Sequence, residues 1–178
     1  GILFHDDVTL SDFEDDSPSA RAQYKKWGLS GNVTEIRSDR KQFDRWTKLK
    51  TDYLDHFAQQ LAHIALDEQP GLKTARNLYA QVALNPNAEE WYAQSLSESI
   101  KHYDYTAIMA MPYMEQAEDS QQFYKDIVDR VKQQECGLER TVIELQSVNW
   151  RKENEPISTQ EMDSTIRSLY NLGVHHIA

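Results

Sequence analysis

The chain carries short apolar runs at a regular spacing. Four of them start at residues 73, 105, 140 and 174, so consecutive starts are roughly 32 to 35 residues apart, about the length of one strand with its crossover helix. A further run lies at the start of the chain. This spacing predicts an α/β fold in which parallel strands alternate with helices. The predicted strands cover residues 2–4, 73–84, 105–111, 140–148 and 174–178.

Amphipathic segments separate the predicted strands, with apolar residues three or four positions apart. The strongest segment covers residues 39–66, where Ser38 or Asp39 is the expected N-cap. Its apolar positions are Phe43, Trp46, Leu49, Tyr53, Phe57, Leu61 and Ile64. Three further helices are predicted over residues 89–102, 119–135 and 159–172. We expect Gly137 and Gly173 to stop the last two of them in the left-handed conformation.

A regular series of strands and helices suggests a (β/α)8 barrel of the TIM type. Such barrels need at least ~200 residues, whereas this chain has 178 and only five predicted strands. We therefore expect a single domain over residues 1–178 that forms the C-terminal five βα units of an incomplete barrel, with three units upstream. The alternative is a self-contained, doubly wound open sheet. Neither a GxGxxG motif nor a P-loop follows any predicted strand, which argues against a nucleotide site.

Composition narrows the range of partners. The formal net charge of −10 disfavours nucleic acid and anionic membrane surfaces, because their phosphates attract an excess of lysine and arginine. Cys136 is the only cysteine, so the chain can form neither an internal disulfide nor a cysteine-based metal site. No apolar run approaches the ~20 residues that a membrane-spanning helix requires. A neutral or cationic partner fits this chain best.

The first predicted strand ends abruptly in His5, Asp6 and Asp7. In α/β folds, ligands bind at the C-terminal edge of the parallel strands, and acidic side chains are costly to bury there. Asp6 and Asp7 are therefore the leading catalytic candidates, with a solvated or capping loop as the structural alternative, and His5 could orient one of them. They could also bind a metal ion, but adjacent residues seldom converge on one ion. We expect neither a metal nor another cofactor.

Polar and aromatic residues also follow the other predicted strands. The candidates for substrate binding are His5, Tyr79, Tyr113, Asn149 and Trp150, with Gln81, Asn85, Glu115 and Gln146 as further polar neighbours. Aromatic rings stack on sugar C–H faces, while carboxylates and amides bond hydroxyl groups, so this set suggests a carbohydrate site. Glu144 lies inside a predicted strand and could face either side of the sheet, so it is not among the candidates.

Several segments of the chain match a known family. They are residues 1–7 (GILFHDD), 10–15 (LSDFED), 109–114 (MAMPYM), 145–150 (LQSVNW) and 172–174 (LGV). Together they resemble the C-terminal glycoside hydrolase domain of the PgaB family of poly-β-1,6-N-acetyl-D-glucosamine N-deacetylases. The resemblance covers nearly the whole chain, and the Phe-His-Asp-Asp segment is its most specific part.

The resemblance implies a (β/α)8 barrel that binds and cleaves partially de-N-acetylated polymer in an electronegative groove. It places the catalytic carboxylate in the His-Asp-Asp segment, which corresponds to Asp6 and Asp7 here. It also implies a periplasmic protein that a lipid anchors to the outer membrane, with an N-terminal deacetylase domain and an outer-membrane export porin as partners. The alternative function is a non-catalytic module that binds the polymer and guides it to export.

Overall fold

A computed structural model describes all 178 residues of the chain. The chain forms two compact units, which we describe separately. The first unit contains Gly1–Asp6, Lys73–Leu84 and Leu96–Ala178, and the second contains Asp7–Leu72 and Asn85–Ser95. The single-domain organisation expected from the sequence stays a prediction.

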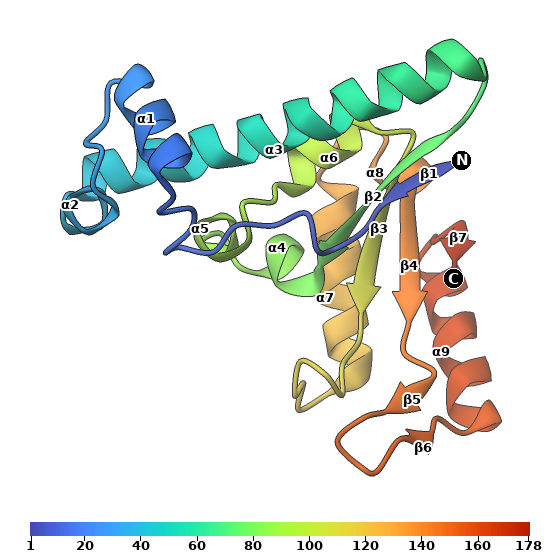
Figure 1. Cartoon of the computed structure of the whole chain (residues 1–178). Coiled ribbons are helices and arrows are strands. Elements are labelled where there is room, and N and C mark those ends of the chain that lie inside the picture. Colours follow the sequence, from blue (N-terminus) through green and yellow to red (C-terminus); the bar gives the residue numbers. More distant parts are fainter. The chain divides into compact units, whose positions relative to one another are not determined.

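The first unit is built on a five-stranded sheet with the order β1-β2-β3-β4-β7 (Figure 1). The strands are β1 (Ile2–Phe4), β2 (Thr74–Tyr79), β3 (Tyr105–Ala110), β4 (Thr141–Leu145) and β7 (His176–Ile177). Every neighbouring pair is parallel. The predicted α/β fold with five parallel strands is therefore confirmed. The sheet is open at β1 and at β7, as an incomplete barrel requires.

Helices cover one face of this sheet, which we call the outer face. They are α4 (Ala80–Leu84), α6 (Leu96–His102), α7 (Ser120–Lys132), α8 (Gly137–Arg140) and α9 (Thr159–Asn171). Leu78, Ile108 and Ile143 point to this face from three adjacent strands and pack in one apolar core with Ile127 of α7 and Leu169 of α9. All five side chains are almost completely buried. This core fixes which residues of each strand point away from the helices.

The opposite side of the sheet, the inner face, carries the alternate residues of each strand, because successive side chains in a strand point to opposite faces. The strand register aligns these residues in rows. They are Leu3, Ala75, Asn77, Tyr79, Tyr105, Ala107, Met109, Val142, Glu144 and His176. Unlike the outer face, the inner face contains amide, carboxyl, phenol and imidazole groups. It can therefore bind a polar ligand.

The structure corrects two predicted elements around β2. Residues 73–84 do not form one strand, since β2 ends at Tyr79 and the chain turns at once into α4. The cause is packing: Ala80 is fully buried in the outer core, and the consecutive residues Val82, Ala83 and Leu84 all pack against it, whereas a strand would alternate them between the two faces of the sheet. Likewise, residues 89–102 form α5 (Ala88–Tyr92) and α6 rather than one helix, because Ala93 between them has a left-handed backbone with φ of 47°.

The fourth predicted strand, residues 140–148, is also too long. β4 ends at Leu145, and the residues beyond it form a separate antiparallel ribbon of β5 (Val148–Asn149) and β6 (Glu155–Pro156). The side chain of Gln146 separates the two, because its Nε2 donates to the carbonyl of Val148 at 2.7 Å.

Of the two glycines that were predicted to end helices in the left-handed conformation, only Gly173 does so. Gly173 ends α9 with φ of +90°, as predicted. At the other stop, Cys136 rather than Gly137 adopts the left-handed conformation, with φ of 54°. Gly137 begins α8, and a Cβ there would lie 1.9 Å from the carbonyl oxygen of Val131. Glycine is thus required at 137 by a close backbone approach and not by its φ.

The second unit contains α1 (Pro18–Lys26), α2 (Val33–Ser38), α3 (Arg40–Glu68) and α5. Asp39 is the N-cap of α3, with Oδ1 accepting from the N–H groups of Lys41 and Gln42. The apolar stripe predicted on this helix divides in two: Phe43 and Trp46 are buried and Leu49 is partly buried against the same core, whereas the later positions are exposed. The exposed side chains are Tyr53, Phe57, Leu61 and Ile64. No helix of the chain has the length and apolar character that crossing a bilayer demands.

Lys50 of α3 is a buried cation with a measurable consequence for stability. It is 1% exposed, donates through Nζ to the carbonyls of Ser11 (2.5 Å) and Glu14 (3.1 Å), and lies 3.8 Å from the ring centroid of Trp46. Burial lowers the pKa of Lys50 from 10.5 to about 8. Between these two values the unfolded chain binds more protons than the folded chain, so the free energy of unfolding must rise with pH.

We expect the thermal midpoint to increase from pH 8 to 9.5, with a contribution from Lys50 of at most about 1.4 kcal/mol per pH unit. Above about pH 10 the trend reverses, since burial raises the pKa of Tyr24 and its ionisation then favours unfolding. Calorimetry of the complete protein measures this slope. A Lys50→Met variant provides the comparison, and an equal slope in that variant contradicts the assignment.

Candidate active site

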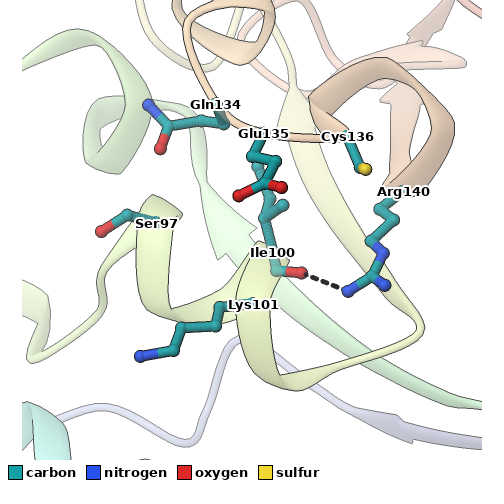
Figure 2. A pocket seen from close by; sticks show the side chains of 7 residues that line it. All are labelled: Ser97, Ile100, Lys101, Gln134, Glu135, Cys136 and Arg140. Carbon is teal, nitrogen blue, oxygen red and sulfur yellow. Dashed lines mark hydrogen bonds between the residues drawn. The ribbon is translucent and has the colours of Figure 1, made fainter.

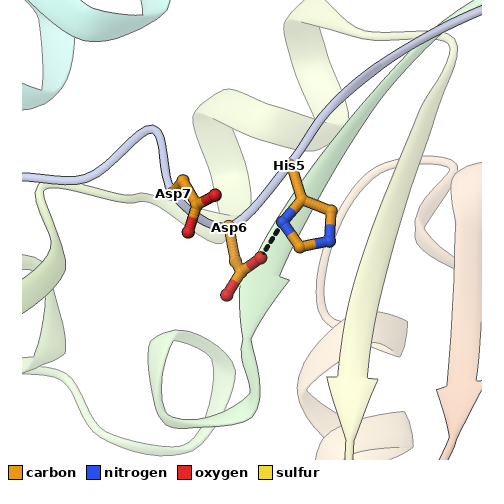
Figure 3. A group of neighbouring side chains, drawn as sticks. All are labelled: His5, Asp6 and Asp7. Carbon is orange, nitrogen blue, oxygen red and sulfur yellow. Dashed lines mark ion pairs between the residues drawn. The ribbon is translucent and has the colours of Figure 1, made fainter.

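His5 and Asp6 lie where β1 ends, and their side chains form an ion pair between His5 Nδ1 and Asp6 Oδ1 (Figure 3). Asp6 is buried at 8% exposure, whereas His5 is exposed. Arg76 of β2 is itself buried and donates from Nη1 to the backbone carbonyl of His5 at 3.1 Å. This bond holds the exit of β1 against the neighbouring strand. The imidazole in turn orients a carboxylate that has little access to water.

Asp7 follows directly and is exposed. As sequence neighbours, His5, Asp6 and Asp7 offer one ligand atom each, all within 4.8 Å of one another, and they are the residues of this chain that could hold a metal ion. A metal ion at this place would have to displace the His5 side chain from Asp6, because His5 Nδ1 already pairs with Asp6 Oδ1.

Glu144 joins this region from the inner face. The register aligns it with Met109, which is aligned with Tyr79 at the end of β2, so Glu144 lies in the last row before the C-terminal edge. Its Oε2 accepts from Asn77 Nδ2 at 3.0 Å. The bond reaches from β2 to β4 over Ala107 of β3, the residue aligned with Asn77, whose small side chain leaves the path open.

The environment of Glu144 favours its neutral form. Burial is the main cause that raises the pKa of Glu144, and the nearby charge of Asp6 adds to it. The amide of Asn77 and the charge of His5 act in the opposite direction without cancelling the rise. A carboxyl group with a raised pKa near a second carboxylate is typical of a functional site. The sequence interpretation did not select Glu144, because its face depends on the exact strand bounds.

Tyr113 and Asn149 are held in place by hydrogen bonds to neighbouring residues. The backbone N–H groups of Tyr113 and Met114 donate to Gln146 Oε1 at 3.2 and 3.3 Å, which joins the loop after β3 to the end of β4. The Tyr113 hydroxyl donates to Glu161 Oε1 at 2.5 Å, and this bond raises the pKa of the phenol. Asn149 is buried, and its Oδ1 accepts from the N–H of Arg151 at 3.1 Å.

The two remaining candidates are more accessible. Tyr79 is half-buried at the end of β2, and Trp150 is 52% exposed just after β5. Parallel topology places the residues after β1, β2, β3 and β4 at the same edge of the sheet. That Asp6 and Asp7 share one cleft with Tyr113 and Trp150 stays a prediction. Gln81 lies in α4, two residues after the end of β2, and its Nε2 donates to Glu115 Oε2 at 2.8 Å, whereas Asn85 follows α4 and not a strand.

A pocket of about 370 Å³ lies elsewhere in the first unit (Figure 2). Arg140 lines it and donates to the carbonyl of Ile100 at 3.1 Å. Because Arg140 immediately precedes β4, this pocket lies at the N-terminal edge of the sheet. In (β/α)8 barrels, residues at the N-terminal edge of the sheet contribute to stability, whereas the active site lies at the C-terminal edge. Its other lining residues are Ser97, Lys101, Gln134, Glu135 and Cys136.

Comparisons with known proteins show which family the chain belongs to. The model of a family described as "Hypothetical glycosyl hydrolase family 13" matches residues 1–178. Poly-beta-1,6-N-acetyl-D-glucosamine N-deacetylase of Escherichia coli K12 is 38% identical over 167 residues, or 91% of this chain, and the O157:H7 protein gives the same values. The solved PgaB (BpsB) glycoside hydrolase domain from Bordetella bronchiseptica is 44% identical, with a TM-score of 0.94 over 99% of this chain.

The matches also show how much of these relatives the chain represents. It spans 25% of the length of the two curated deacetylases and 50% of the solved glycoside hydrolase chain. The five-stranded open sheet is consistent with that share of a (β/α)8 barrel.

Proposed function

The chain belongs to the hypothetical glycosyl hydrolase family 13, and on this premise we propose that it binds and cleaves partially de-N-acetylated poly-β-1,6-N-acetyl-D-glucosamine. The observation that carries the proposal is the buried Asp6 carboxylate, paired with His5 at the C-terminal edge of a parallel sheet. That edge is where (β/α)8 enzymes place their catalytic groups. The similarity to the PgaB glycoside hydrolase domain supports the same substrate class.

The proposed reaction needs one protonated and one charge-stabilising group. A carboxyl of the Asp6–Asp7 pair donates its proton to the bridging oxygen, and the bond between that oxygen and the anomeric carbon breaks. Water adds its oxygen to the anomeric carbon and gives up a proton, which restores the acid. Either a carboxylate or the acetamido oxygen of the substrate stabilises the cationic centre.

Charge complementarity supports this substrate. De-N-acetylated units carry ammonium groups near neutral pH, and the chain has a formal net charge of −10. Opposite charges steer the polymer to the protein and orient it there. Tyr79, Tyr113, Asn149 and Trp150 are the proposed residues for sugar contacts around the carboxylates.

The place of this activity follows from the same family. We propose that the complete protein joins this domain to an N-terminal deacetylase and is held at the periplasmic side of the outer membrane by a lipid outside this segment. There it would trim the polymer during biofilm exopolysaccharide processing, before an outer-membrane porin exports it. The second candidate function is a binding module that guides the polymer to that porin without cleavage.

One experiment separates the two functions. The complete protein is incubated with partially de-N-acetylated polymer, and mass spectrometry measures chain length over time. Shorter chains that accumulate with time are expected for a hydrolase. A protein that retains the polymer in a binding assay but yields no shorter chains is a binding module, and that result rejects the enzymatic proposal.

A further inference from the structure

Glu144 forms no ion pair with a cationic side chain, although the charge of His5 acts on it. Its hydrogen-bond partner is the neutral amide of Asn77. Asp6 lies close enough to act on its charge, and the imidazole of His5 already pairs with Asp6. Two carboxylates thus share one imidazole in a partly buried place. Such an arrangement disfavours the negative charge of Glu144 until a cation enters.

Asn77 gives an independent indication that a donor is missing. Its side chain is 3% exposed, and Nδ2 bonds to Glu144 while Oδ1 has no hydrogen-bond partner in the protein. A buried acceptor that lacks a donor costs free energy of about 1–3 kcal/mol. The cluster of Glu144, Asp6 and Asn77 therefore offers several acceptors and few donors. A positively charged group with several N–H donors complements it best.

We propose that Glu144, held in place by Asn77, binds the ammonium group of a glucosamine unit and so selects de-N-acetylated positions of the polymer. This inference rests on the proposed function, and it adds which group of the substrate is recognised and by which residue. The position fits, because Glu144 lies in the last row of the inner face, level with Tyr79. A sugar ring that lies against the Tyr79 side chain places its substituents over the row of Tyr79, Met109 and Glu144.

Selection follows from the difference between the two substituents. An ammonium group brings a full positive charge and three donors, which offset the desolvation of Glu144 and the repulsion from Asp6. An acetamido group is neutral and bulkier and has one N–H donor, so the cost of the partly buried Glu144 carboxylate remains. The same residue thus attracts the de-N-acetylated unit and disfavours the acetylated one.

The test compares Glu144→Gln with Glu139→Gln in the complete protein. Glu139 is an exposed carboxylate of α8, at the opposite edge of the sheet, so its variant changes the net charge equally without touching the cluster. Calorimetry measures the Kd of de-N-acetylated and fully acetylated β-1,6 oligosaccharides. We expect Glu144→Gln to weaken binding of the de-N-acetylated ligand roughly tenfold, to reduce its salt dependence, and to leave the acetylated ligand unchanged.

Three results would overturn this assignment. Equal weakening of both ligands means a structural role, and unchanged Kd values mean no role in binding. A fall in kcat with unchanged KM means that Glu144 serves the bond cleavage instead. If the wild-type protein produces no shorter chains, the proposed function fails, while the calorimetric comparison still decides whether Glu144 selects the ammonium group. Asn77→Ala provides a second variant, for which we expect the same selective loss.

Discussion

Replacing Asp6 with asparagine is expected to lower the rate of polymer cleavage by ~10²–10⁴, the usual contribution of general acid–base catalysis. Asparagine keeps the size of the side chain but cannot deliver a proton. Asp6 is buried and paired with His5, so its carboxyl is held in one orientation at the exit of β1. The fold should persist, because packing of this strand depends on Phe4, which contacts Tyr103.

Asp7→Asn is the natural comparison, since Asp7 is adjacent but exposed. We expect it to impair cleavage less than Asp6→Asn does. Product formation and the thermal midpoint of the complete protein are measured together for both variants. Wild-type rates in both would remove these residues from the mechanism. Loss of activity only together with loss of the folded state would mean that they are structural.

The architecture could be predicted because its signal extends along the chain. Strand spacing, apolar runs and the glycine at 173 all point to parallel strands alternating with helices, and the structure has that order. The exact ends of the individual strands and helices were harder to predict. Residues 80–84 are apolar enough to extend β2, and only their burial in the outer core shows that they turn into α4. Similarly, the apolar stripe of α3 does not reveal which of its side chains find partners.

The candidate site was predictable in part for a related reason. Residues 5–7 follow a strand directly, so their place at the sheet edge depends little on the strand's exact start. Glu144 is different, because a shift of one residue would turn it from the inner face to the outer face. Its pairing with Asn77 also connects β2 to β4, which are not adjacent. Such a contact needs the register of three strands, which the sequence alone does not provide.

The largest loss of stability is expected for Gly137→Ala. The new Cβ would lie 1.9 Å from the carbonyl oxygen and 2.9 Å from the carbonyl carbon of Val131, both backbone atoms of the last turn of α7. Rotation of a side chain cannot relieve this overlap, so the backbone between α7 and α8 must move. Overpacking of this kind costs about 1–3 kcal/mol and occasionally more, and Val131 itself is buried in the outer core.

Gly71→Ala is the matched control, because it separates steric overlap from backbone conformation. Gly71 has φ of +91°, and a Cβ there meets nothing within 4 Å, so only the conformational cost of roughly 1–2 kcal/mol applies. Thermal unfolding of the complete protein should therefore show a larger fall in midpoint for Gly137→Ala than for Gly71→Ala. The opposite order would mean that the turn around Cys136 adapts easily. Conversely, Cys136→Gly should raise the midpoint, because glycine removes the strain of a left-handed residue with φ of 54°.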